Sequence, residues 1–271
     1  MAVFPEIIHT DVPTGSFQCV LFDFDGTISL IREGWQGIMI PLFIELLADT
    51  PRGRQETDAF LQQTVREFVF IGTGKQTIYQ CISLAEHIEQ YGGTPSDPML
   101  YKDEYIRRLM LHIDNRRRGL GNGSLSSDDL MVPGSRALLN SLRDRGLTLY
   151  LASGTDIEHV RQEAELLGIT EYFLGCIYGA LRDYKNFSKA MVIRQIIQEH
   201  NLSGIELLGF GDGYVEIEEV KKAGGFACGV ASNEAERVGI DDWKRERLIR
   251  AGADLIIPDY HDLRSLETYL F

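Results

Sequence analysis

Two carboxylates follow a short apolar run near the start of the chain, in the sequence Cys-Val-Leu-Phe-Asp-Phe-Asp-Gly-Thr. The run Cys19–Phe22 is apolar without alternation, which predicts a buried strand of a parallel sheet. Gly26 then allows a sharp turn, so that Asp23 and Asp25 would stand at the carboxyl end of the strand, where ligands bind in open α/β sheets. Two like charges this close favour a cation between them, and Mg²⁺ prefers such oxygen ligands. The alternative is a solvated Asp-Gly turn without chemistry.

Polar side chains also follow two later apolar runs. Ser153 and Gly154 come after the first of these and are expected to open a helix, whose free N–H groups could hold phosphate oxygens together with the serine hydroxyl. A plain helix cap is the alternative for Ser153. Asp212 follows the second run in the turn Gly-Asp-Gly. Because the carboxyl ends of parallel strands meet at one edge of a sheet, we expect these residues to join the first two carboxylates.

The elements that must position these residues alternate between strand and helix, which predicts a doubly wound, mostly parallel sheet of the Rossmann type. Ser188 is expected to cap a helix over Lys189–Glu199, and the first 17 residues are expected to be irregular. The predicted strands cover residues 19–22, 147–152, 172–178 (the weakest), 205–210, 226–231 and 255–257, with a closing helix near 263–270.

A helical segment interrupts this pattern between the first and second strands. Apolar residues recur there at helical spacing, and Gly- and Pro-containing breaks separate the helices. The sequence therefore predicts two domains: an α/β core formed by residues 1–30 and 132–271, and a helical insertion formed by residues 31–131.

Composition limits the partners. The formal charge of −13 at pH 7 weighs against nucleic acid or an anionic membrane surface. No apolar run approaches the roughly 20 residues that span a bilayer, and no secretory signal is visible at the N-terminus. The four cysteines form no C-x-x-C pair, as expected for reduced thiols, so we expect a cytoplasmic protein.

The Asp-x-Asp-Gly-Thr pattern after an apolar strand resembles the first motif of haloacid dehalogenase (HAD) superfamily phosphatases. The resemblance implies that Asp23 is the nucleophile that accepts the phosphoryl group, that Asp25 is the general acid and base, and that Thr27 supports the turn. The helical insertion resembles the cap domain of the β-phosphoglucomutase and phosphonatase branch, which closes over the site and selects the substrate.

The other motifs of that family have counterparts in the expected order. Ser153 corresponds to the second motif, and the resemblance implies a phosphate site that includes Gly154, Gly26 and a lysine. Lys185 and Lys189 both qualify as that lysine, and Lys189 is favoured because it opens an apolar-periodic helix. Asp212 corresponds to the fourth motif, which usually reads Gly-Asp-x-x-x-Asp, and implies a metal ligand.

This chain departs from the fourth motif in its second acid, which is Glu216. Glu216 is expected to be a metal ligand or an acceptor for metal-bound water. The alternative is a solvated glutamate on a helix surface.

Substrate contacts from the cap are expected from Lys75, Trp35 or Arg32. The alternative for Lys75 is a plain helix–helix loop, and for Trp35 and Arg32 it is core packing or surface exposure. The Gly-Thr-Gly-Lys sequence that ends at Lys75 resembles a phosphate-binding loop, but it lacks the first glycine and the hydroxyl residue of that motif. The three consecutive arginines at 116–118 are expected on a solvated helix face.

The resemblance implies an Mg²⁺-dependent phosphatase that acts on a small phosphorylated metabolite, such as a sugar phosphate, through an aspartyl-phosphate. A phosphomutase would use the same residues and return the phosphoryl group to the substrate. A phosphonoacetaldehyde-type hydrolase would need a lysine from the cap, for which Lys75 is the candidate. A phosphate-binding or phospho-switch protein is the non-enzymatic alternative.

Overall fold

The computed structural model describes residues 5–271, and the first four residues of the expected lead-in lie outside this range. The chain forms two compact units. The larger unit, here called the core unit, contains the chain up to Glu33 and Arg116–Phe271. The smaller unit, here called the inserted unit, is Gly34–Asn115. Residues 116–131, which we expected in the insertion, group with the core unit.

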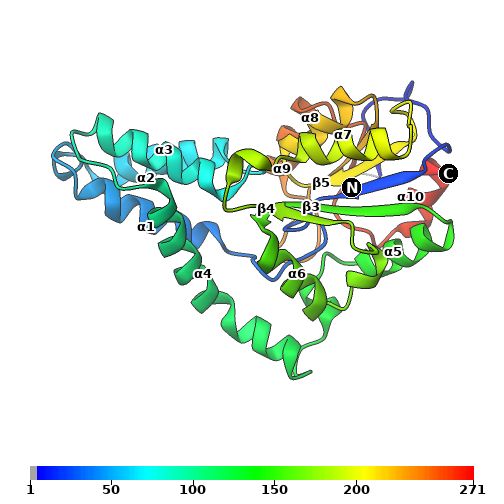
Figure 1. Ribbon diagram of the computed structural model, residues 1–271, viewed down its shortest axis with the longest axis horizontal. Coiled ribbons are helices and arrows are strands. Elements are labelled where there is room, and N and C mark those ends of the chain that lie inside the picture. The colour runs from blue at the N-terminus through cyan, green and yellow to red at the C-terminus, as the bar shows by residue number, and fades with distance from the viewer. Residues whose placement is uncertain (1–4) are drawn as a thin grey trace. The chain divides into compact units, whose positions relative to one another are not determined.

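The core unit contains a seven-stranded sheet in the order β1-β7-β6-β5-β2-β3-β4 (Figure 1). All neighbouring strands are parallel except β1, which pairs antiparallel with β7. This confirms the doubly wound α/β fold with a mostly parallel sheet. The strands are β1 Glu6–Ile7, β2 Cys19–Phe22, β3 Thr148–Asp156, β4 Ile177–Ala180, β5 Leu207–Gly211, β6 Phe226–Val230 and β7 Leu255–Ile257.

Helices cover both faces of the sheet. In Figure 1, α7, α8 and α9 lie on one face, and α5, α6 and α10 lie on the other. Apolar side chains of α7, α8 and α9 pack with residues of β2, β5 and β6 in a buried cluster. The helices are α5 Ser135–Asp144, α6 Ile157–Leu166, α7 Lys189–Glu199, α8 Tyr214–Lys222, α9 Asp242–Arg250 and α10 Leu263–Leu270.

Three adjacent strands at the centre of the sheet are buried from end to end. Every residue of β2, β5 and β6 is buried, as the unbroken apolar runs predict. β2 lies between β3 and β5, so the carboxyl ends of these three strands are neighbours. Here the strand order departs from the chain order, which is the position where open α/β sheets bind ligands.

The inserted unit is helical. Its helices are α1 Gln36–Ala48, α2 Asp58–Ile71, α3 Thr77–Gln90 and the first part of α4 Pro98–Gly121, with a 3₁₀ turn at Gly53–Gln55. α1 packs against α2 and α3 through buried side chains, among them Phe43, Val65 and Cys81. None of the helices in residues 5–271 is long and apolar enough to cross a membrane.

Several local predictions need correction. The lead-in, expected to be irregular, contains β1, which forms an edge of the sheet. The expected strand at 172–178 is shorter and lies later, at Ile177–Ala180, while a 3₁₀ turn covers Thr170–Tyr172. Ser188 does cap α7 as predicted, because its side chain accepts a hydrogen bond from the Met191 N–H at 3.2 Å. β1 was missed and the bounds of β4 were wrong because short segments show too little periodicity to define where a strand begins and ends.

Candidate active site

Asp23 lies at the carboxyl end of β2 and is nearly buried. Its backbone N–H donates to the carbonyl of Phe210 on β5 at 2.9 Å, which holds the start of the turn against the neighbouring strand. Its Oδ1 lies 2.8 Å from Nζ of Lys189, the first residue of α7. Lys185, the other candidate lysine, is exposed and lies near the ring of Tyr184. The structure therefore brings Lys189 to Asp23.

Three charged groups surround Asp23 and act on its pKa. Burial raises the pKa of Asp23 well above its usual range; the Lys189 ammonium opposes this, and the carboxylates of Glu216 and Asp212 add to it. Burial alone would lower the pKa of Lys189, but Asp23 and Glu216 outweigh this and raise it. Lys189 therefore stays protonated.

Glu216 is 2% exposed and therefore does not lie on a solvated helix surface. Its Oε1 accepts a hydrogen bond from the Gly213 N–H at 2.5 Å, which caps the N-terminus of α8. Its Oε2 accepts from Lys189 Nζ at 2.8 Å. Both oxygens are thus engaged, and Glu216 connects the turn after β5 to the lysine that holds Asp23.

Asp212 sits in the turn after β5, where a second lysine reaches it. Nζ of Lys244, from α9, lies 2.8 Å from Asp212 Oδ2 and 2.6 Å from Glu234 Oε1. It also donates to the Ser232 hydroxyl at 3.2 Å, and that hydroxyl donates to the Gly26 carbonyl at 2.7 Å. The loop after β6 is thereby tied to the turn after β2.

The turn at Gly26 requires glycine. Gly26 has φ +77°, and a Cβ there would collide with Oδ2 of Asp212. The two turns that carry Asp25 and Asp212 therefore approach each other closely. The Gly26 N–H, expected to contact phosphate, donates instead to the Ser29 carbonyl at 2.9 Å.

The donor set at this position fits a divalent cation. One carboxylate oxygen each from Asp23, Asp212 and Glu216 lies within 4.8 Å of the others. Oxygens on opposite sides of an Mg²⁺ ion stand about 4 Å apart, so the three acids have nearly the spacing that one ion needs. With Glu234 they amount to four carboxylates against two ammonium groups, Lys189 and Lys244. When all four carboxyl groups are ionised, two negative charges are in excess, and a bound dication would neutralise them.

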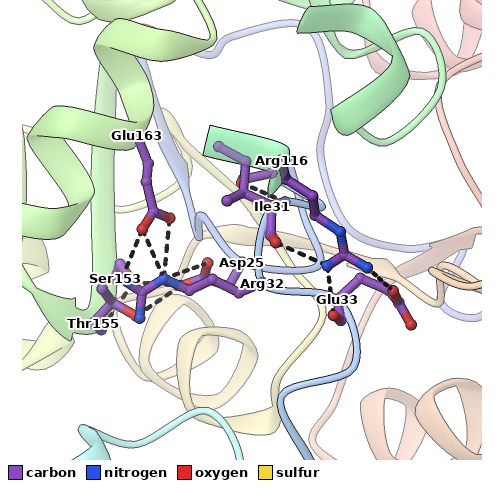
Figure 2. A network of polar contacts seen from close by, with 9 residues as sticks. Asp25, Ile31, Arg32, Glu33, Arg116, Ser153, Thr155 and Glu163 are labelled. Carbon is purple, nitrogen blue, oxygen red and sulfur yellow. Dashed lines mark hydrogen bonds and ion pairs between the residues drawn. The ribbon is translucent and has the colours of Figure 1, made fainter. Parts of the chain in front are cut away.

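Asp25 faces a different set of groups. Its Oδ2 accepts from the Thr155 hydroxyl at 2.9 Å and from the Ser153 hydroxyl at 3.2 Å (Figure 2). Its Oδ1 is buried without a hydrogen-bond partner in the described part of the chain. Although a quarter of the side chain is exposed, the enclosure raises the pKa of Asp25 to about 6, against the opposing charge of Arg32. Such a carboxyl group can both give and take a proton near neutral pH.

Ser153 and Gly154 do not open a helix. Both lie within β3, which continues to Asp156, and α6 begins only at Ile157. The pairing of β3 with β4 shifts register between Ala152 and Asp156, so the strand is irregular where these residues lie. The Ser153 hydroxyl accepts from the Thr155 N–H at 3.0 Å and donates to Asp25. The expected helix N-terminus is therefore absent at Ser153.

The three residues expected to contact the substrate from the insertion lie in different parts of the structure. Arg32 belongs to the core unit, where it is buried and bonded to Glu163. Trp35 belongs to the inserted unit, where it is half-buried just before α1. Lys75 is exposed in the loop between α2 and α3. Only the first of these therefore lies in the unit that carries Asp23.

Sequence reasoning missed several residues of the site. Glu163 lies between Val160 and Ala164 on the buried side of α6, and Lys244 lies one turn before the buried Leu248 on α9. A charge inside an apolar stripe was the available signal, since a buried charge needs a partner. Thr155, two residues after Ser153 on a strand, was detectable because such residues share one face. Glu234 and Ser232 gave no signal of this kind.

With this geometry established, the sequence can be compared with known families. The family model for haloacid dehalogenase-like hydrolases matches residues 17–224. The chain belongs to the haloacid dehalogenase-like hydrolases. This confirms the family resemblance and makes the protein an enzyme of the hydrolase type. The matched range includes the inserted unit as well as β2, β3 and β5.

Solved structures share the fold of this hydrolase at low sequence identity. A β-phosphoglucomutase from Clostridium difficile is 16% identical with a TM-score of 0.63, over 94% of this chain and 97% of that one. A predicted phosphatase from Clostridium acetobutylicum is 21% identical with a TM-score of 0.62, over 94% and 100%. A HAD family hydrolase from Deinococcus radiodurans, with bound phosphate and sodium, is 18% identical with a TM-score of 0.55, over 94% and 96%. No curated protein matches the sequence.

Proposed function

We propose that this hydrolase is an Mg²⁺-dependent phosphatase that acts on a small phosphorylated metabolite through an aspartyl-phosphate on Asp23. One observation carries the proposal: the buried carboxylate of Asp23 lies 2.8 Å from the ammonium of Lys189, and Asp25, with a pKa of about 6, follows two residues later. A nucleophile held by a cation and a proton-transfer group on the same turn are the parts that two-step phosphoryl transfer needs.

In the proposed reaction, a carboxylate oxygen of Asp23 attacks the phosphorus and the bond to the leaving oxygen breaks. Asp25 gives its proton to that oxygen, so that the product leaves as an alcohol. Asp25 then takes a proton from water as the water attacks the phosphorus of the aspartyl-phosphate, which returns Asp23 as a carboxylate and releases inorganic phosphate. Lys189, with Ser153 and Gly154, would stabilise the charge on the phosphate oxygens.

Asp23, Asp212 and the backbone carbonyl of Asp25 would hold Mg²⁺, in line with the charge and spacing of the acids around Asp23. When bound, the ion supplies positive charge that lowers the repulsion between the carboxylate and the phosphate. We assign Glu216 to a supporting role, since its two oxygens already hold Lys189 and the Gly213 N–H. Lys244 holds one oxygen of Asp212 and leaves the other available.

We further propose that the inserted unit acts as the cap that selects the substrate, with Lys75 and Trp35 as candidate contacts. The names of the similar structures, a β-phosphoglucomutase, a phosphatase and a hydrolase with bound phosphate, support a phosphorylated substrate. The four cysteines are free thiols, three of them buried. This supports the predicted cytoplasmic environment, because disulfides are rare there.

A phosphate-release screen tests the function. The purified full-length protein is incubated with sugar phosphates, nucleotides and small phosphorylated acids, with Mg²⁺ or with a chelator. We expect steady release of inorganic phosphate from at least one class, abolished by the chelator. Isomerisation of a sugar phosphate without phosphate release would identify the mutase instead. No turnover of any phosphate ester would contradict the proposal.

Glu216→Gln is expected to weaken Mg²⁺ binding more than it slows the saturated enzyme. Glutamine keeps the reach to the Gly213 N–H but removes the charge that holds Lys189, so Lys189 is expected to compete with the metal for Asp23. Losses from such supporting contacts are about 10- to 100-fold in metal affinity. The measurements are an Mg²⁺ titration of activity and the Mg²⁺-dependent rise of the melting temperature without substrate.

The matched control for this variant is Glu218→Gln, on the same helix. Its side chain is 42% exposed and lies 3.5 Å from Lys222. The control is expected to keep the parent's Mg²⁺ curve. If Glu216→Gln also keeps that curve in both measurements, Glu216 has no influence on the metal site.

A further inference from the structure

Arg32 and Glu163 form a buried ion pair beside the site. Glu163 is fully buried, and Arg32 is 5% exposed. Arg32 Nε donates to both Glu163 oxygens, at 3.1 and 3.0 Å, and Nη2 donates to Oε1 at 2.8 Å (Figure 2). This two-point contact fixes the plane of the guanidinium group. Because an apolar pair of similar volume is often as stable as a buried ion pair, stability alone does not account for these charges.

The same guanidinium lies next to Asp25, at the outer limit of an ion pair. Arg32 Nε is 3.9 Å from Asp25 Oδ1, beyond hydrogen-bond distance. The Thr155 and Ser153 hydroxyls hold the other oxygen of Asp25, while Oδ1 accepts no hydrogen bond from the described residues. Since Glu163 engages Nε and Nη2 of Arg32, the arginine is kept from closing on Asp25. One oxygen of Asp25 is thus anchored, and the other remains available.

The backbone that carries Arg32 is also held. Arg116 Nη1 donates to the carbonyls of Ile31 at 2.9 Å and Glu33 at 2.7 Å, and its Nη2 donates to the Glu33 carboxylate at 2.7 Å (Figure 2). Both neighbours of Arg32 in the chain are therefore fixed within the core unit. The position of the guanidinium is set from two ends, by Glu163 at the side chain and by Arg116 at the backbone.

We propose that Arg32, held by Glu163, is a positioning residue for Asp25: it keeps the free oxygen of that carboxyl group in the orientation that serves proton transfer to the leaving group. The proposal rests on the proposed function, in which Asp25 is the general acid and base. In this role Arg32 and Glu163 act through Asp25.

The test compares two leaving groups in a variant that removes both charges together. Arg32→Met alone would strand a buried carboxylate and strongly destabilise the fold, whereas Arg32→Met with Glu163→Leu replaces the pair by apolar side chains of similar size. The substrates are an aryl phosphate, p-nitrophenyl phosphate, whose leaving group needs no proton, and the best alkyl phosphate from the screen. The ratio of their kcat/KM values on one sample does not depend on the folded fraction of that sample, and it excludes the hydrolysis step that both substrates share.

We expect the double variant to lose about 10- to 100-fold in kcat/KM on the alkyl phosphate, a part of what a general acid contributes. The aryl phosphate should lose less than about threefold in kcat/KM, because this ratio reports only the steps through departure of the leaving group and not the later hydrolysis of the aspartyl-phosphate. The matched control is Arg136→Met, which removes a partly buried arginine of the core unit bonded to Asp128, Ser127 and the Leu167 carbonyl. The control is expected to keep the parent's ratio.

The outcomes of this comparison distinguish the role of Arg32 from the role of Asp25. If Asp25→Asn changes the ratio of alkyl to aryl turnover and the double variant does not, the positioning role is wrong and the proposed function stands. An equal loss on both substrates in the double variant overturns the positioning role too, because a general loss of packing predicts it. If Asp25→Asn itself leaves the ratio unchanged, the role of Asp25 fails, and the role of Arg32 falls with it.

Discussion

Asp23→Asn is expected to abolish turnover by several orders of magnitude while the fold persists. Asparagine keeps the shape of the side chain and can still accept from Lys189, which lies 2.8 Å from Oδ1. It cannot attack phosphorus as a carboxylate, so no aspartyl-phosphate forms. Steady-state kinetics on the best substrate, together with mass spectrometry of the acid-quenched protein, would measure both losses.

The same substitution is expected to raise the melting temperature at neutral pH in the absence of metal. The pKa of Asp23 is raised by burial, so the folded state binds its proton more tightly than the unfolded state does. Stability is therefore lost as the pH rises from the unfolded-state pKa through the raised folded-state pKa, and the neutral amide removes that loss. Asp144→Asn, on an exposed aspartate of α5, is the control and should change neither property. Near-parental turnover in Asp23→Asn would overturn the proposed function.

Asp25→Asn is expected to slow turnover of alkyl phosphates by roughly 10²- to 10⁴-fold, the usual range for a general acid or base. The amide can still accept hydrogen bonds from Thr155 and Ser153, so the turn should keep its structure. It can neither donate the proton that an alkoxide needs nor accept one from water. The loss should be smallest for substrates with good leaving groups when the first step limits the rate.

A comparison of aryl and alkyl phosphates at saturating Mg²⁺ measures this effect. Thr268→Ala, which removes a hydroxyl bonded to the Arg264 carbonyl on α10, is a control for a lost polar contact in the core unit. Equal losses on the two substrates would count against proton donation by Asp25, although Asp25 could still support the turn.

The parts of the fold that were predictable are those that local patterns encode. The unbroken apolar runs at β2 and β5 predict buried parallel strands, and the glycine-containing turns after them place Asp23, Asp25 and Asp212 at the same edge of the sheet. The choice of Lys189 was also predictable. It is the first residue of α7, a helix whose apolar periodicity the sequence shows.

The parts that were not predictable depend on partners far apart in the chain. Nothing local distinguishes Glu163 from other helix glutamates, because its partner Arg32 lies 131 positions earlier in the chain. Lys244 is likewise ordinary until Asp212 and Glu234 surround its ammonium group. Ser153 was misplaced for another reason: β3 continues past the residue where its apolar run ends, and only the pairing with β4 shows this.

The arginines at 116–118 illustrate how a charged run can conceal a specific contact. We expected a solvated helix face, but Arg116 bonds two carbonyls and a carboxylate of the segment 31–33. Its neighbour Arg117 fits the expectation better, since it donates an exposed hydrogen bond to Gln162. Adjacent residues of one charged run can therefore have different surroundings, which the run itself does not predict.

The hold of Arg116 on residues 31 and 33 has a consequence for how such a protein can diversify. The chain leaves the core unit after Glu33 and re-enters it at Arg116, so one side chain bridges the exit and the entry. A segment whose two ends are pinned side by side can be lengthened, shortened or exchanged with little change in the entropy of closing the loop. The stretch between these points can therefore be exchanged while the sheet and its acids keep their sequence. In the cap role proposed above for the inserted unit, such an exchange would change the substrate preference.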